Sequence, residues 1–188
     1  MNNKKAAMFG LDARIALAIF GALSVISGAA LYSAIKQSNA TSTLVEMQEI
    51  AKAYEQHYLD TGSHLVEQTP YILQSKGLVE DNSITGWRGP YLSYPAVPSN
   101  YVMQHPRYNH IHITRMQDAQ GWKTSVNRVC TDPKNCTLWV TINGVPDSDM
   151  STTIDQMVDG GDGLALGNFQ TTHSNTIYHL RIMNVEYP

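Results

Sequence analysis

The chain has few residues of the kinds on which catalysis and structural metal binding commonly depend. It contains two cysteines among 188 residues, which is too few for a structural zinc site, and no histidine lies at zinc-finger spacing from them. Gly-x-Ser-x-Gly, glycine-rich phosphate-binding and His-Glu-x-x-His motifs are also missing from the sequence. These absences predict that the protein is not an enzyme.

The net charge of −3 is small and unevenly divided. Residues 1–40 contain four basic residues and one acidic residue, which gives +3 there and leaves −6 for residues 41–188. A basic start on an acidic body is typical of a membrane protein whose N-terminus lies inside the cell. It argues against nucleic-acid binding, which needs a basic face.

An uncharged run of 21 residues extends from Ile15 to Ile35, bracketed by Arg14 and Lys36. At about 1.5 Å per residue, a helix of this length spans the hydrocarbon core of a bilayer, which is about 30 Å thick. A cleaved secretory signal has a shorter apolar region that ends at a cleavage site. Because this run continues into a helical pattern instead, it predicts a single membrane-spanning segment.

The helical pattern continues beyond the apolar run. No proline or glycine interrupts residues 29–61, and Gly62 then offers a C-terminal stop. We therefore expect one helix from about Ala13 to Leu59, apolar all round in its first half and amphipathic in its second; a plain anchor with a short stalk helix is the alternative. The apolar positions that share one helical face, at spacings of three and four, are Leu44, Met47, Ala51, Tyr54 and Tyr58.

Small residues are frequent inside the apolar half, and Gly21 and Gly28 are two of them. Small side chains let helices approach closely, in lipid or in a bundle. Glycine is also common in membrane helices in general, so packing against other subunits and ordinary composition both explain the pattern.

The remainder of the chain predicts a mostly antiparallel sheet, so the fold class is α+β. A short helix is expected over residues 70–76, because Thr69 can cap it, Pro70 suits its first position and Gly77 can end it. A second short helix is expected over residues 146–158. The alternating, β-branched segments predict strands at 109–116, 123–129, 137–143, 167–171 and 176–183.

Three groups of side chains are candidates for special chemistry. Cys130 and Cys136 flank a turn-like loop and are expected to form a disulfide in an oxidising compartment, with two free thiols as the alternative. His110 and His112 share a strand face near His105, for which a polar face is favoured over a metal site. Carboxylates near three glycines could hold Ca²⁺, but a helix-terminating turn is favoured, so no cofactor is expected. These carboxylates are Asp155, Asp159 and Asp162.

Four stretches together resemble the type IV pilin and type II secretion pseudopilin superfamily. They are the basic leader MNNKKAAMFG before an apolar helix, the helix end KAYEQHYLDTG, the turn GWRGPYL, and LWVTINGVP followed by IDQMVDGGDG and GNFQ. The resemblance implies that a prepilin peptidase cuts after Gly10, so that Leu11 becomes the new N-terminus. It also implies that subunits leave the membrane and pack their long helices in a fibre core.

The N-terminus departs from the family pattern at two positions. The family commonly has Phe as the first mature residue and Glu as the fifth, where this chain has Leu11 and Ile15. The nearest acid is Asp12, close to Arg14. Because a charge buried in an apolar core needs a partner, Asp12 either takes the place of the glutamate or pairs with Arg14.

The resemblance implies a structural subunit of a type IV pilus or a type II secretion pseudopilus. Its expected partners are further copies of itself, other pilin-like subunits and the prepilin peptidase. It would reside in the bacterial inner membrane with its C-terminal domain in the periplasm, and later in an extracellular filament. The expected parts are a leader at 1–10, an assembly helix at 11–36 and a globular domain at 37–188. A non-polymerising, membrane-anchored periplasmic binding or sensor domain is the alternative function.

Overall fold

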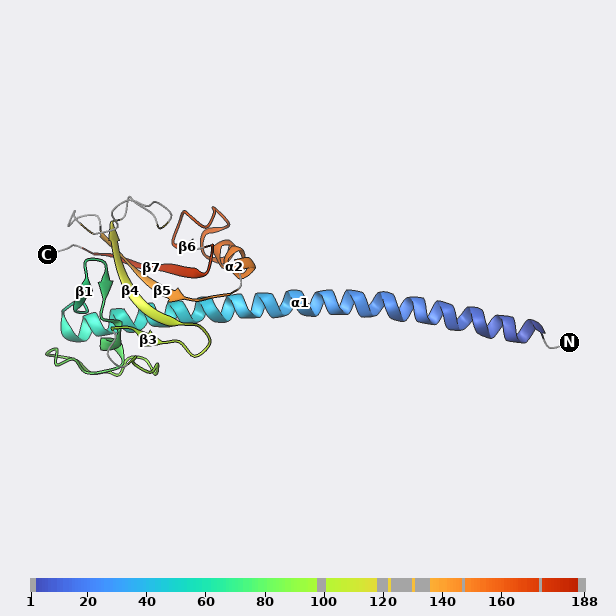
Figure 1. Ribbon diagram of the computed structural model, residues 1–188, viewed down its shortest axis with the longest axis horizontal. Coiled ribbons are helices and arrows are strands. Elements are labelled where there is room, and N and C mark those ends of the chain that lie inside the picture. Colours follow the sequence, from blue (N-terminus) through green and yellow to red (C-terminus); the bar gives the residue numbers. More distant parts are fainter. Residues whose placement is uncertain are drawn as a thin grey trace. The chain divides into compact units, whose positions relative to one another are not determined.

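The computed structural model describes residues 3–97, 101–117, 122, 130, 136–146, 148–172 and 174–185. The chain divides into two units, Met1–Asn39 and Ala40–Pro188. Helix α1, Asn3–Thr61, contributes to both of them (Figure 1). The expected helix over about 13–59 is therefore confirmed, and it extends further at both ends.

In the first unit, every residue of α1 from Gly10 to Ile35 is exposed. By length and composition the helix is apolar enough to cross a membrane. An uncharged run of this length is long enough to span the hydrocarbon core of a bilayer.

In the second unit, one face of α1 is buried against the sheet. The exposed positions between the buried ones carry polar groups such as Glu49, Lys52 and Glu55, which gives the amphipathic pattern that periodicity predicts. A series of buried residues at intervals of three or four consists of Ala40, Leu44, Met47, Ile50, Tyr54 and His57, and Thr43 and Ala53 beside them are buried as well.

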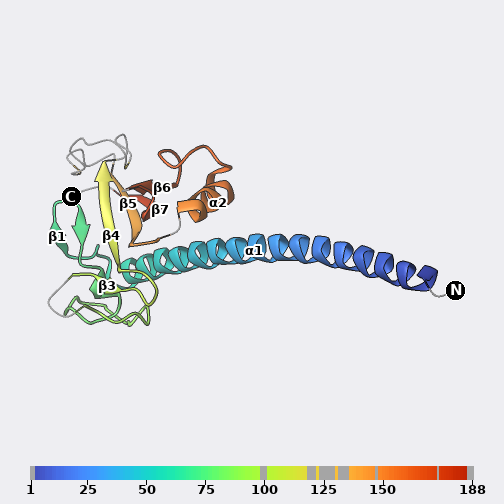
Figure 2. The same ribbon diagram turned by 45° about the vertical axis from the view of Figure 1, so that its right-hand side comes forward.

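Within the described residues of the second unit, seven strands form an antiparallel sheet with the order β1-β2-β4-β5-β7-β6, and β3 pairs with β4. Figure 2 labels the central strands β4, β5 and β7. The long central strands β4, β5 and β7 make most of the ladder. The strands are β1 Glu67–Thr69, β2 Ile72–Leu73, β3 Met103–Gln104, β4 His110–Gln117, β5 Cys136–Asn143, β6 Phe169–Thr172 and β7 Ile177–Val185. The α+β class expected from the sequence is thus confirmed.

The two faces of the central strands differ in character. Ile113, Val140 and Leu180 belong to the main core, which they share with α1. The alternate positions on the same strands are also buried but include polar side chains such as Thr114, Thr141 and His179. These are linked in a chain, with Thr114 Oγ1 3.1 Å from Thr141 Oγ1, and Thr141 Oγ1 3.0 Å from His179 Nδ1.

The prediction of a helix over residues 70–76 is wrong. Pro70 and Tyr71 instead form the turn of a hairpin between β1 and β2, in which the Ile72 backbone N–H donates to the Thr69 hydroxyl at 3.2 Å. Leu73 then pairs with β4 and is buried. The local capping signals do not produce a helix here, because pairing with β4 provides hydrogen bonds for the backbone of β2 and buries Leu73. A 3₁₀ turn, η1 Ser75–Leu78, follows.

The other expected elements are confirmed where the structure describes them. Helix α2, Ser148–Asp159, matches the helix predicted over 146–158. Strands β4, β5, β6 and β7 match four predicted strands within a few residues. The strand predicted over 123–129 lies outside the described residues.

Candidate functional site

The residues expected to direct processing and assembly all lie within α1. Gly10 and Leu11 are in continuous helix, as are Gly21 and Gly28. A Cβ atom added at Gly10, Gly21 or Gly28 would meet nothing within 4 Å. Since the subunit itself does not need glycine at these positions for space, any requirement for small residues must come from outside the subunit.

Asp12 and Arg14 make no ion pair with each other in the described part of the chain. Residues two apart on a helix point in different directions, which explains why the pairing considered from the sequence does not form within α1. Both residues are exposed. Their charges are thus available to groups outside the chain.

A polar network attaches the loop before β4 to α1. Glu46 of α1 accepts a hydrogen bond at Oε1 from the Tyr94 hydroxyl at 2.6 Å, and at Oε2 from Nη2 of Arg107 at 2.9 Å. Nε2 of His105 lies 3.1 Å from Oε1. Beside this network a shallow groove is lined by Ser42, Val45, Glu46, Glu49, Tyr94 and Arg107.

The ring of His105 is locked by its backbone surroundings. Its Nδ1 accepts hydrogen bonds from the backbone N–H groups of Arg107 and Tyr108, at 2.9 and 3.0 Å. The ring therefore carries its proton on Nε2 when neutral, and that nitrogen faces Glu46. The sequence grouped His105 with His110 and His112, but the structure separates it from them, because those two contact Asn143 instead.

The three acidic candidates lie together at the end of α2. Carboxylate oxygens of Asp155, Asp159 and Asp162 come within 4.8 Å of one another. Asp159 accepts hydrogen bonds from the backbone N–H groups of Asn168 and Phe169, at 2.7 to 2.9 Å. This is the helix-terminating turn that the sequence favours, with one carboxylate holding the following loop in place.

Asp155 is the exception among the three, because it is 4% exposed and its Oδ1 has no hydrogen-bond partner among the described residues. Its Oδ2 accepts from the Gly163 backbone N–H at 3.2 Å. Burial raises the pKa of Asp155 above its ordinary value; the neighbouring charges of Asp162 and Asp159 add to this rise, and the Gly163 hydrogen bond opposes it. Among the described residues, Asp155, Asp159 and Asp162 form the group of carboxylates close enough together to hold a hard cation such as Ca²⁺.

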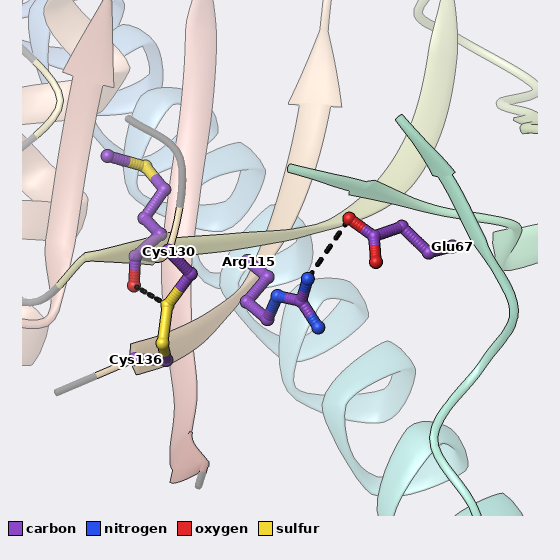
Figure 3. The surroundings of a disulfide bond; sticks show 5 residues. Glu67, Arg115, Cys130 and Cys136 are labelled. Carbon is purple, nitrogen blue, oxygen red and sulfur yellow. Dashed lines mark hydrogen bonds and ion pairs between the residues drawn. A yellow bond between two sulfur atoms is a disulfide. The ribbon is translucent and has the colours of Figure 1, made fainter. Parts of the chain in front are cut away.

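Cys130 and Cys136 are paired in a disulfide, with Cα atoms 5.8 Å apart, in keeping with the sequence prediction. Figure 3 shows the pair beside β4, where Arg115 reaches from this strand towards Glu67 on β1. Nη2 of Arg115 lies 3.0 Å from Oε1 of Glu67. The ion pair thus ties the β1–β2 hairpin to β4.

Sequence reasoning missed the Glu46 network and the Arg115–Glu67 pair. The partners of Glu46 are 48 and 61 positions away along the chain, and no local pattern links residues so far apart. Comparisons of the chain with protein-family models, with curated proteins and with solved structures found no match.

Proposed function

We propose that this chain is a structural subunit that assembles through α1 into a helical filament, either a type IV pilus or a type II secretion pseudopilus. The observation that carries the proposal is the division of α1 into two parts. Residues 15–35 are uncharged and exposed, whereas residues 40–57 of the same helix provide a buried face to the domain core. We include in the proposal that the chain has no catalytic role.

Exposed apolar surface of this extent needs an apolar partner. Lipid supplies one before assembly, and the helices of neighbouring subunits supply another afterwards. Because both partners are apolar, the transfer need not place the surface in water. The open space around Gly21 and Gly28 is compatible with close approach of a second helix at these positions.

The motifs that resemble pilins have structural roles in the domain, which supports the proposal. Within GWRGPYL, Trp87 donates from Nε1 to the Gly77 carbonyl at 2.9 Å, and its ring meets the Tyr91 ring edge to face. Within LWVTINGVP, Gly144 has a φ of 79°, and a Cβ there would lie 2.5 Å from the Asn109 side chain. The turn after β5 therefore requires glycine.

The filament proposal can be tested with Gly21→Leu and Gly28→Leu in cells. Leucine keeps the segment hydrophobic, so anchoring is expected to persist. The added bulk is expected to separate helices that must touch, at about 1–3 kcal/mol per overpacked contact, and so to shorten or abolish filaments. Val25→Leu is a matched control, because a large exposed side chain is already present there. Electron microscopy and membrane fractionation give the two readouts.

Processing is tested separately with Gly10→Val. A β-branched residue before the cut is expected to block a prepilin-type peptidase, which leaves the full-length chain in the membrane. N-terminal sequencing of the wild-type protein is expected to begin at Leu11.

The alternative is a non-polymerising, membrane-anchored periplasmic binding or sensor domain. Ile15 favours it, since the family's assembly glutamate is missing from that position. Filaments of normal length in both glycine variants, together with an uncut wild-type N-terminus, would support this alternative against the filament subunit.

A further inference from the structure

His110 and His112 lie two positions apart on β4 and share one face of the strand, with their rings stacked at a centroid distance of 5.4 Å. Asn143, the last residue of β5, contacts both of them. Its Nδ2 atom is 2.9 Å from Nε2 of His110 and 3.4 Å from Nδ1 of His112. Two imidazole nitrogens from different rings are therefore directed at one point.

The hydrogen bonds define the state of these nitrogens. An amide nitrogen donates and does not accept, so each imidazole nitrogen that faces Asn143 presents a lone pair and each ring carries its proton on its other nitrogen. A neutral imidazole with an available lone pair is the form that binds metal ions. Both imidazole rings with such lone pairs project from the regular backbone of β4.

We propose that His110 and His112 form a binding site for a late first-row divalent transition-metal ion, and that Asn143 contributes its amide oxygen once the amide has rotated by half a turn. Imidazole suits Cu²⁺, Zn²⁺ and Ni²⁺, whereas Ca²⁺ and Mg²⁺ require oxygen ligands. Cu²⁺ binds most tightly in the series. Water completes the coordination, because His110 is half-buried and leaves the pair accessible.

The two rings of the pair differ in exposure. His112 is 8% exposed, whereas His110 is half-buried, so an ion would approach from the side of His110. His105 is not part of the site, because its Nδ1 is occupied by two backbone N–H groups.

The test uses the full-length protein in detergent, freed of metal with EDTA and titrated with Cu²⁺ and separately with Zn²⁺. Isothermal titration calorimetry is expected to give one site, and thermal unfolding is expected to shift upwards with either ion. Pulsed electron paramagnetic resonance of the Cu²⁺ form is expected to detect two imidazole nitrogens.

His110→Gln is the main variant, because its amide can still reach Asn143 while one imidazole is lost. It is expected to weaken Cu²⁺ binding on the order of 100-fold and to reduce the signal to one imidazole. His64→Gln is the matched control: His64 is also half-buried, but its Nδ1 contacts the Tyr54 hydroxyl at 2.6 Å. It is expected to leave the affinity unchanged.

A variant with higher metal affinity distinguishes the loss of a ligand from the loss of folding. Asn143→Asp places a carboxylate, a stronger ligand, at the third position, so it is expected to bind Zn²⁺ at least about tenfold more tightly. Two results would overturn the proposal. One is a wild-type protein that binds neither ion; the other is Cu²⁺ affinity that is the same in His110→Gln and in wild type.

Discussion

Arg107 donates from Nη2 to Oε2 of Glu46 across 2.9 Å, which joins the loop before β4 to a helix residue 61 positions earlier. The Tyr94 hydroxyl and the His105 ring occupy the other oxygen of the same carboxylate. Burial raises the pKa of Glu46, but the close contact of the His105 ring and the hydrogen bonds from Tyr94 and Arg107 outweigh it and lower the pKa to about 2. The loop is thus attached to α1 by an ionised carboxylate.

Glu46→Gln should destabilise the domain by about 1–3 kcal/mol at neutral pH, since the variant loses charge-assisted hydrogen bonds at a site whose side chain is 15% exposed. Because the folded pKa lies below the ordinary value of 4.5, this stability is present above about pH 4.5 and is lost as the pH falls towards 2. Denaturant unfolding at pH 7 and pH 3 measures both effects. The exposed neighbour Glu49, changed to Gln, should cost less than about 0.5 kcal/mol. Equal losses in the two variants would contradict the role of Glu46.

The disulfide should stabilise the domain measurably. Closing so short a loop contributes about 2–3 kcal/mol by restricting the unfolded chain, so the Cys130→Ser, Cys136→Ser double variant should unfold at a lower denaturant concentration. Mass spectrometry of unreduced peptides from envelope-purified protein checks the bond itself. Two free thiols in that material would refute the pairing.

His57 should make the domain sensitive to acid. Its ring is fully buried, both nitrogens lack a hydrogen-bond partner in the described structure, and it meets Tyr91 edge to face. Burial lowers the pKa of His57, the negative charge of Asp60 opposes this, and the neighbouring His64 adds slightly to the lowering. With a depressed folded pKa, stability is present above about pH 6.5 and is lost as the pH falls below it.

His57→Phe tests this directly, because phenylalanine retains a ring against Tyr91 without a group that must gain a proton. Its stability at pH 7 should equal or exceed that of wild type, and its loss of stability between pH 6.5 and pH 5 should be smaller. Chemical unfolding at three pH values within this interval measures the slopes. Parallel slopes for the two proteins would show that another group is responsible.

Asp155→Asn should stabilise the domain at pH 7 in EDTA, because burial of Asp155 disfavours its ionised carboxylate. A raised folded pKa means that the ionised carboxylate is disfavoured on folding, so the benefit of the neutral amide should disappear as the pH is lowered and Asp155 takes up a proton. Thermal unfolding at pH 7 and pH 4 checks the sign. If Ca²⁺ raises the melting temperature of wild type but not of the variant, the carboxylates of the turn hold the ion. A variant less stable than wild type in EDTA would contradict the prediction.

Elements with a strong local signal were predictable from the sequence. Of the face predicted for α1, Leu44, Met47 and Tyr54 are buried, since helix periodicity depends on near neighbours alone. Ala51 is only half-buried and Tyr58 is 37% exposed, so the prediction fails at these two positions. The central strands β4 and β5 were also predictable, because the alternation of β-branched residues is a pattern within a single segment. The residues at 70–76 carried a helix signal that was equally local but misleading.

The sequence by itself determined the long helix with its apolar and amphipathic halves, the α+β class and the cysteine pair, because each depends on composition or on spacing within one segment. Only the tertiary structure decided that residues 67–73 form a hairpin. It also decided that Glu46 accepts hydrogen bonds from Tyr94 and Arg107, and that the side chain of Asn143 contacts His110 and His112. The physical reason is that strand pairing and side-chain hydrogen bonds join residues distant along the chain. Their partners are selected by the register of β4 against its neighbours, which the alternation of side chains within a single strand cannot specify.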